Sequence, residues 1–141
     1  MIHAKVHELK KVFRVHYLIS KSAKEPHVKF SHKLLLFYAV ECGLKVLLLQ
    51  KIRGSTTEAF MLHRELKDKL NGKNGHNIKY ILSYLGYGHF KLPSLSCMNG
   101  SSAPPSEYNQ IWRYGIEVDF ESEKRIIEEL WEIVEWINRR I

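Results

Sequence analysis

The sequence predicts an all-α fold, an up-and-down bundle of four or five helices. Apolar residues recur three or four positions apart in nearly every periodic segment, which places them on one face of a helix. No segment alternates cleanly between apolar and polar residues as a half-buried strand would, and no internal repeat is present. Amphipathic helices bury their apolar faces against each other, so a helical bundle is the natural architecture.

The first half of the chain predicts two long helices. Residues 4–20 place Val6, Leu9, Phe13 and Tyr17 on one face, with Lys10, Lys11 and Arg14 off its centre. After a turn at residues 22–26, a helix from about residue 32 to 52 is apolar almost all round, and Ser31 is its expected cap. A helix with almost no polar face is expected at the centre of the bundle.

The middle of the chain predicts two shorter helices. The run Ser55-Thr56-Thr57-Glu58 matches a capping box and is expected to start a helix that continues to Leu70. Residues 71–75 have turn composition, and a short helix follows with Asn77 near its start. Its inward positions are expected to be Ile78, Ile81, Leu82 and Leu85.

The last third combines a loop with the strongest helix signal. Residues 86–107 hold three glycines, three prolines and five serines, so we expect a long irregular loop of the kind that is usually functional or mobile. Residues 107–116 predict a short amphipathic helix ending at Gly115. From about Asp119 to Ile141, acidic residues begin the helix and arginines end it, as the helix dipole favours. The apolar stripe is Ile126, Leu130, Ile133, Val134, Ile137 and Ile141.

Length and composition indicate one ordinary globular domain over residues 1–141. With 45% hydrophobic and 26% charged residues, a chain of 141 residues buries roughly 70% of the surface that its unfolded form exposes. Two cysteines, Cys42 and Cys97, make neither a disulfide framework nor a four-ligand zinc site. The N-terminal segment lacks the apolar region of a secretory signal, and residues 34–49 are interrupted by charges. We therefore expect a cytoplasmic protein without membrane contact.

The net charge of +7 is unevenly distributed along the chain. Residues 1–53 carry 11 basic and 3 acidic side chains, whereas residues 94–141 carry 5 and 9. The acidic end can attract the basic half within the fold or between two copies, and the charge can also serve solubility alone. Any surface for a polyanion such as RNA must come mainly from the first two helices, so Lys10, Lys11 and Arg14 are the candidate phosphate contacts, together with Lys45.

Two sets of polar residues are candidates for a functional site. Glu41 and Lys45 lie one turn apart in the favourable order for an ion pair, so Glu41 either pairs with Lys45 or reaches a cation such as Arg113. His76, directly before Asn77, is either a capping or packing residue or lines a pocket. His3 and His7 have helical spacing but no third ligand nearby, and neither a P-loop nor a nucleophile elbow is present, so no metal or cofactor is expected.

Three segments in this order resemble the HEPN superfamily of small helical bundles. They are the long helix with an acid and a base at residues 38–45, the His-Asn-Ile helix start at residues 76–78, and the arginine in Trp112-Arg113-Tyr114-Gly115. The resemblance covers roughly residues 30–141. It implies a four-helix up-and-down core, a homodimer and metal-independent RNA cleavage in toxin–antitoxin, antiphage or RNA-processing systems, where a cognate antitoxin or another protein is the partner.

The chain departs from the family pattern at one position. Catalytic members carry a histidine separated from the arginine by four to six residues, but here Val118, Asp119 and Phe120 occupy those positions after Arg113. Either the protein is not a nuclease of the usual kind, or a histidine from elsewhere stands near Arg113, with His76 first and His63 second. The resemblance then implies Arg113, His76 and Glu41 as catalytic residues. The alternatives are a catalytically silent adaptor for a protein or nucleotide, and a helical interaction protein in which Arg113 and Glu41 pair.

Overall fold

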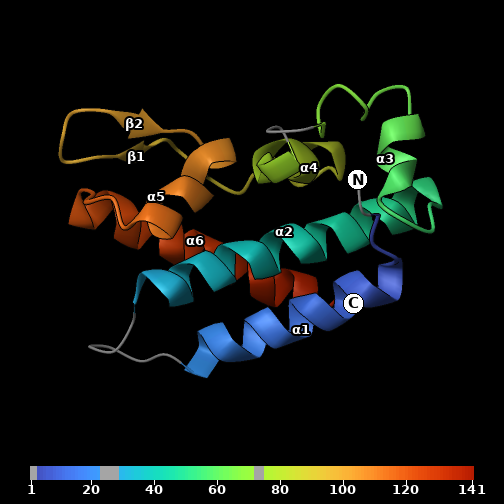
Figure 1. The fold of residues 1–141 in the computed structure, drawn as a ribbon, viewed down its shortest axis with the longest axis horizontal. Helices are drawn as coiled ribbons and strands as arrows, with labels where there is room; N and C mark the ends of the chain where they lie inside the picture. Colours follow the sequence, from blue (N-terminus) through green and yellow to red (C-terminus); the bar gives the residue numbers. More distant parts are fainter. Residues whose placement is uncertain (1–2, 23–28, 72–74) are drawn as a thin grey trace.

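The computed structural model describes residues 3–22, 29–71 and 75–141 and confirms the all-α prediction (Figure 1). Besides the helices, the described residues contain one two-stranded sheet late in the chain. Of the expected turns, residues 23–26 and 72–74 lie outside the described residues. The elements are α1 (Val6–Ser22), α2 (Phe30–Ile52), α3 (Glu58–Leu62), α4 (Ile78–Tyr84), β1 (Leu95–Ser96), β2 (Ser102–Ala103), the 3-10 helix η2 (Pro105–Glu107), α5 (Tyr108–Tyr114) and α6 (Phe120–Asn138).

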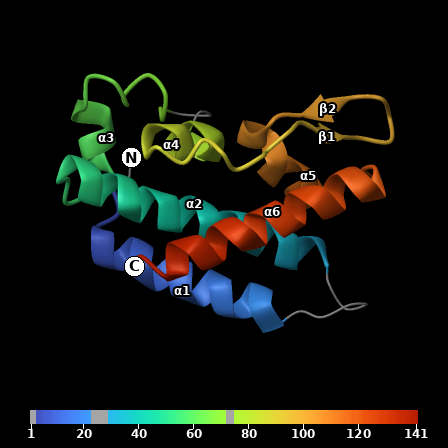
Figure 2. The same cartoon turned by 180° about the vertical axis from the view of Figure 1, so that it is seen from behind.

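Helix α2 is the centre of the bundle, as its apolar sequence predicts. Helices α1 and α6 pack on it from one side, and α4 and α5 cover the other side (Figures 1 and 2). Its side chains Phe37, Val40, Leu44 and Leu48 are fully buried. No helix within residues 3–22, 29–71 and 75–141 has both the length and the apolar character needed to cross a membrane. Most of the apolar side chains of α2 are buried inside this bundle.

Helix α6 follows its predicted pattern closely. The Asp119 side chain caps it by accepting the Ser122 backbone N–H at 2.9 Å. Its predicted stripe from Ile126 to Ile137 is buried. The close approach to α2 occurs at Gly43, where a Cβ atom would lie 2.6 Å from Cγ2 of Ile137. A glycine on α2 thus allows the two helices to pack.

Replacing Gly43 with alanine is expected to lower the free energy of unfolding by about 1–2 kcal/mol. The added methyl group overpacks the α2–α6 contact, which costs more than the roughly 1 kcal/mol that alanine gains over glycine in a helix. Chemical denaturation measures the change. In the Gly43→Ala/Ile137→Ala double variant the losses should be less than additive, whereas a Gly43→Ala variant more stable than the native chain contradicts this packing.

Two predicted helix starts are wrong. Helix α2 begins at Phe30 rather than after Ser31, because the His32 ring takes the capping role: its Nδ1 accepts the Lys29 backbone N–H at 3.1 Å. The predicted capping box at residues 55–58 does not form, because the hydroxyl group and the backbone N–H of Thr57 bind the N-terminal segment instead. The Thr57 hydroxyl accepts the Ala4 N–H at 3.0 Å, and Thr57 N–H donates to the Ala4 carbonyl.

The predicted third helix is also too long. Helix α3 ends at Leu62, because His63 is extended and its Nδ1 accepts the Glu65 backbone N–H at 3.2 Å, a local bond that competes with the helix. Turns continue from there to Leu70, and Leu66 and Leu70 remain buried. The apolar spacing therefore identified the correct buried residues but the wrong local structure.

The segment 86–107 contains a hairpin that the sequence did not predict. Strands β1 and β2 pair antiparallel, with Leu95 opposite Ala103. Leu95 is fully buried, and the Asp119 N–H at the start of α6 donates to the Ser96 carbonyl at 2.8 Å. Two-residue strands are too short to show alternation in a sequence. The hairpin packs along α6 and places α5 beside α2 (Figure 2).

Candidate functional site

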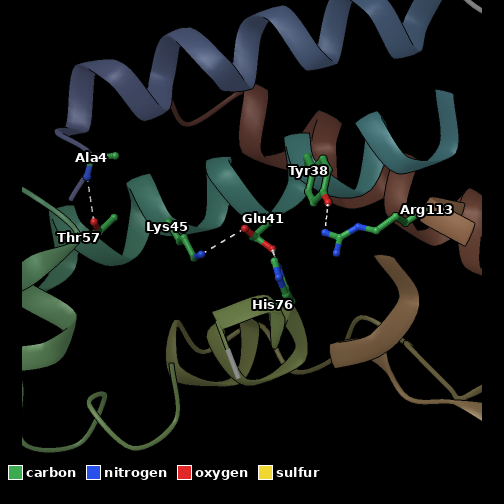
Figure 3. Close-up of polar contacts among 7 residues, drawn as sticks. All are labelled: Ala4, Tyr38, Glu41, Lys45, Thr57, His76 and Arg113. Atoms are coloured by element: carbon green, nitrogen blue, oxygen red, sulfur yellow. Dashed lines mark hydrogen bonds and ion pairs between the residues drawn. The ribbon is translucent and has the colours of Figure 1, made fainter. Parts of the chain in front are cut away.

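A row of polar side chains lies on one face of the otherwise apolar helix α2. Tyr38, Glu41 and Lys45 are spaced by three and four residues, so they follow one another along that face. Partners reach them from α5 and from the start of α4, on the same side of α2 (Figure 3). The row therefore gathers the residues that the sequence indicated for chemistry.

Glu41 is the buried centre of the row and binds two cations or potential cations. Only 8% of its surface is exposed. Its Oε2 accepts from Nζ of Lys45 at 3.2 Å, and its Oε1 lies 2.5 Å from Nδ1 of His76. The predicted pair with Lys45 is confirmed. The alternative pair with Arg113 is wrong, because both carboxylate oxygens are engaged and Arg113 binds elsewhere.

His76 is held against Glu41 by the start of α4. The Asn77 side chain caps that helix by accepting the Tyr80 N–H at 3.2 Å, and Ile78 is fully buried. The capping role considered for His76 therefore belongs to Asn77. The ring of Phe37 packs near the imidazole with 6.5 Å between ring centroids. Since a carboxylate only accepts hydrogen bonds, Nδ1 carries the proton, and Nε2 has no hydrogen-bond partner among the residues that the structure describes.

The environment of Glu41 favours its charged form. Burial alone raises the pKa of this carboxyl group, but the hydrogen bond with His76 and the charge of Lys45 outweigh burial, and the net pKa is lowered. The neighbouring Cys42 thiol behaves in the opposite way: burial, followed by the Glu41 charge, raises its pKa to about 12. Cys42 is therefore a thiol at neutral pH and is not a nucleophile.

The lowered pKa of Glu41 predicts a loss of stability in acid. A carboxyl group with a folded-state pKa below its ordinary value of 4.5 stabilises the fold above pH 4.5, and this contribution disappears as the pH falls through the folded-state pKa. Urea denaturation between pH 3 and pH 7 measures this. The Glu41→Gln variant should lose less stability over the same range, and equal slopes for both proteins would contradict the assignment.

A pocket of about 360 Å³ opens beside the Glu41–His76 pair. We call it the Glu41 pocket. It lies between the N-terminal segment, α2, α3 and the start of α4, and Cys42 and Lys45 form part of its wall. An imidazole that is oriented by a carboxylate and lines a pocket has the groups of a general base. The other lining residues are His3, Ala4, Leu9, Thr57, Phe60, Met61, Leu70, Asn71 and Gly75.

Arg113 reaches the same face of α2 from α5, at Tyr38, one helical turn from Glu41. It follows the buried Trp112 on α5, is exposed, and its Nη2 donates to the hydroxyl of Tyr38 at 2.9 Å. The phenols of Tyr38 and Tyr114 raise the pKa of the Arg113 guanidinium, which keeps its charge. Figure 3 shows Arg113 and His76 both directed at α2. The spacing of residues did not indicate a polar role for Tyr38, because a tyrosine on an apolar helix is ordinarily a core residue.

The basic residues of α1 lie apart from the Glu41 pocket. Lys11 and Arg14 are exposed, and Lys10 is half-buried beside a shallow depression that Ser55 and Thr56 also line. None of the three lines the Glu41 pocket among the residues that the structure describes. The structure therefore brings together Glu41, Lys45 and His76, with Arg113 nearby, and leaves Lys10, Lys11 and Arg14 on a separate surface.

The residue pattern did not indicate a second buried carboxylate, Glu123. Glu123 accepts from Nζ of Lys33 at 2.6 Å and from the indole N–H of Trp112 at 3.1 Å. Its position near the start of α6 predicted a dipole contact, and nothing in its spacing indicated partners on α2 and α5. Since every polar partner is internal, this cluster joins three helices at the end of the bundle that carries Arg113.

Neither a metal cluster nor a relative identifies the site. Within the described ranges, no three His, Cys, Asp or Glu side chains are grouped so that they could hold a metal ion. His63, the second histidine candidate, packs edge-to-face on Tyr84 with 6.1 Å between ring centroids. Comparisons with protein-family models, with curated proteins and with solved structures found no significant match.

Proposed function

We propose that the protein is a HEPN-like, RNA-associated domain that cleaves RNA without a metal ion. The observation that supports this is the Glu41–His76 pair at the edge of the Glu41 pocket, with Lys45 on the same carboxylate. Arg113, which binds Tyr38 from α5, adds a positive charge beside the same face of α2. As the family resemblance implies, the proposal includes a cytoplasmic homodimer that acts as a toxin or antiphage nuclease and is controlled by a cognate protein partner.

The proposed reaction is an internal transesterification of RNA. Nε2 of His76 takes the proton of a ribose 2′-hydroxyl, while Glu41 holds the ring through Nδ1 and stabilises the imidazolium that forms. The O2′–P bond forms and the P–O5′ bond breaks, and the 5′ oxygen takes a proton from solvent. The products are a 2′,3′-cyclic phosphate and a 5′-hydroxyl. Arg113 and Lys45 supply positive charge for the phosphorane-like transition state.

One observation favours a second candidate, the catalytically silent adaptor. Helix α1 exposes Val12, Val15, Leu18 and Ile19, although its opposite face is packed on the bundle. Exposed apolar groups on one side of a helix are typical of a surface that binds another protein. This candidate predicts a stable complex with a partner and no change in added RNA.

The experiment that separates the two candidates uses unstructured RNA in buffer with EDTA. We expect the protein to bind the RNA in a salt-dependent manner and to cleave it. A matched oligonucleotide with a 2′-deoxyribose at the cut position should be bound but left intact at that position. Intact RNA together with salt-independent or undetectable binding would overturn the proposal and leave the adaptor.

Substituting Arg113 with alanine is expected to reduce cleavage by about 10²-fold or more while the bundle remains folded. The reason is that Arg113 is exposed and supports the transition state rather than the core. Arg125→Ala, which removes an exposed arginine from α6, is the matched control and should cleave normally. Equal rates for both variants, with unchanged thermal unfolding, would remove Arg113 from the site.

A further inference from the structure

The wall of the Glu41 pocket differs in chemistry from one side to another. Charged groups lie along the α2 and α4 sides of the pocket, at Glu41, Lys45 and His76. The remaining walls include Leu9, Phe60 and Leu70, which are 8%, 4% and 8% exposed, and the half-buried Met61. The pocket therefore combines polar and charged side chains on its α2 and α4 sides with apolar side chains on other parts of its wall.

This division of polarity limits which part of an RNA can enter. A phosphate needs hydrogen bonds or cations, so its place is at Lys45, on the side of the pocket that also carries His76, and not among Leu9, Phe60 and Leu70. A nucleobase has flat apolar faces and polar edges, which suits a pocket whose wall has both apolar and polar parts. A volume of about 360 Å³ is within the range of sites that hold small organic groups.

The rim supplies groups that suit the edge of a base. Asn71 is exposed and lines the pocket, and its amide offers both a donor and an acceptor. The thioether of Met61 is a soft, adaptable contact for an aromatic ring. The bond from Ala4 N–H to the Thr57 hydroxyl fixes the N-terminal segment along this side of the pocket (Figure 3).

We propose that the Glu41 pocket is a base-binding subsite that takes one unpaired nucleobase of a single-stranded RNA. The nucleotide bound there presents its 2′-hydroxyl to His76 and its phosphate to Lys45. Proteins that select single-stranded RNA commonly hold a base turned out of the stack in this way. The inference rests on the proposed function, because it assigns the substrate of the same site, and it makes RNA duplexes poor substrates.

A binding experiment tests the subsite separately from catalysis. Uridine and adenosine 3′-monophosphates are titrated into the protein and followed by NMR, with ribose 5-phosphate as the probe that lacks a base. We expect a nucleotide to bind and to shift Met61 and His76 signals, and to bind more tightly than ribose 5-phosphate. Met61→Ala should weaken nucleotide binding by about tenfold, within the range for a lost base contact.

Matched variants separate the pocket from the rest of α3. Leu62, the neighbour of Met61, is 78% exposed and does not line the pocket, so Leu62→Ala should bind like the native chain. Asn71→Ala changes an exposed position and keeps the test usable where Met61→Ala fails to fold. It should alter the preference between uridine and adenosine nucleotides.

The outcomes for binding and for cleavage are distinguishable. Nucleotide binding that depends on Met61 supports the subsite even where RNA is not cleaved, in which case the proposed nuclease activity fails alone. Cleavage with equal rates for native, Met61→Ala and Asn71→Ala proteins, on single strands and duplexes alike, overturns the subsite and keeps the nuclease. Neither nucleotide binding nor cleavage overturns both.

Discussion

Replacing His76 with alanine is expected to lower the rate of RNA cleavage by about 10²–10⁴-fold, the usual contribution of a general base. Nδ1 of this ring lies 2.5 Å from the Glu41 carboxylate, so the variant loses the imidazole that Glu41 orients. RNA affinity should change little, because the phosphate contacts remain. Single-turnover cleavage and equilibrium binding, measured on the same RNA, give the two quantities.

The control for this variant is another half-buried histidine. His63→Ala removes a ring that packs on Tyr84 and bonds within its own turn, so it should cleave RNA at the native rate. A His76→Ala protein that cleaves within a factor of three of the native rate, a margin well inside the expected loss, would remove His76 from the chemistry. The opposite pattern, with His63 required, would move the site to the turn after α3.

The Glu41→Gln substitution is expected to destabilise the protein by about 3 kcal/mol, because it breaks a buried ion pair and leaves the Lys45 ammonium without its partner. The amide also presents an N–H group to either Lys45 or His76, both of which are donors. For a chain of this length the melting temperature should fall by on the order of 10 °C. Differential scanning calorimetry measures the shift.

An exposed carboxylate provides the comparison for Glu41. Glu128 lies on the outer side of α6, and Glu128→Gln should change stability by less than about 0.5 kcal/mol. Cleavage should fall in Glu41→Gln but not in Glu128→Gln, since only Glu41 orients His76. An unchanged melting temperature for Glu41→Gln would show that the carboxylate is not a structural partner of Lys45.

The long helices could be predicted because each buries apolar side chains, and this burial requires an apolar pattern that is visible in the sequence. Helices α1, α2 and α6 lie within two residues of their predicted ends at most positions, and α2 is central because nearly every face of it is apolar. The Glu41–Lys45 pair was also predictable, since helical spacing alone brings the two side chains together. These features depend on residues that are close in the sequence, so the spacing of residues is enough to predict them.

Features that depend on contacts between distant segments could not be predicted. Whether Glu41 binds Arg113 or His76 is decided by how α4 and α5 dock on α2, and the outcome is His76 for Glu41 and Tyr38 for Arg113. The capping box at residues 55–58 fails because Ala4, more than fifty positions away, binds Thr57. The Glu123 cluster likewise joins three helices that are separate in the sequence.

The most direct test of the proposed Glu41–His76 site is chemical rescue of His76→Ala by imidazole, in buffer with EDTA. The account predicts that added imidazole restores cleavage at the native positions, that the rate rises with imidazole concentration, and that the products end in 2′,3′-cyclic phosphate. The same addition should not restore Arg113→Ala. Native protein that leaves RNA intact, or a His76→Ala protein that cleaves at the native rate without imidazole, would contradict the account.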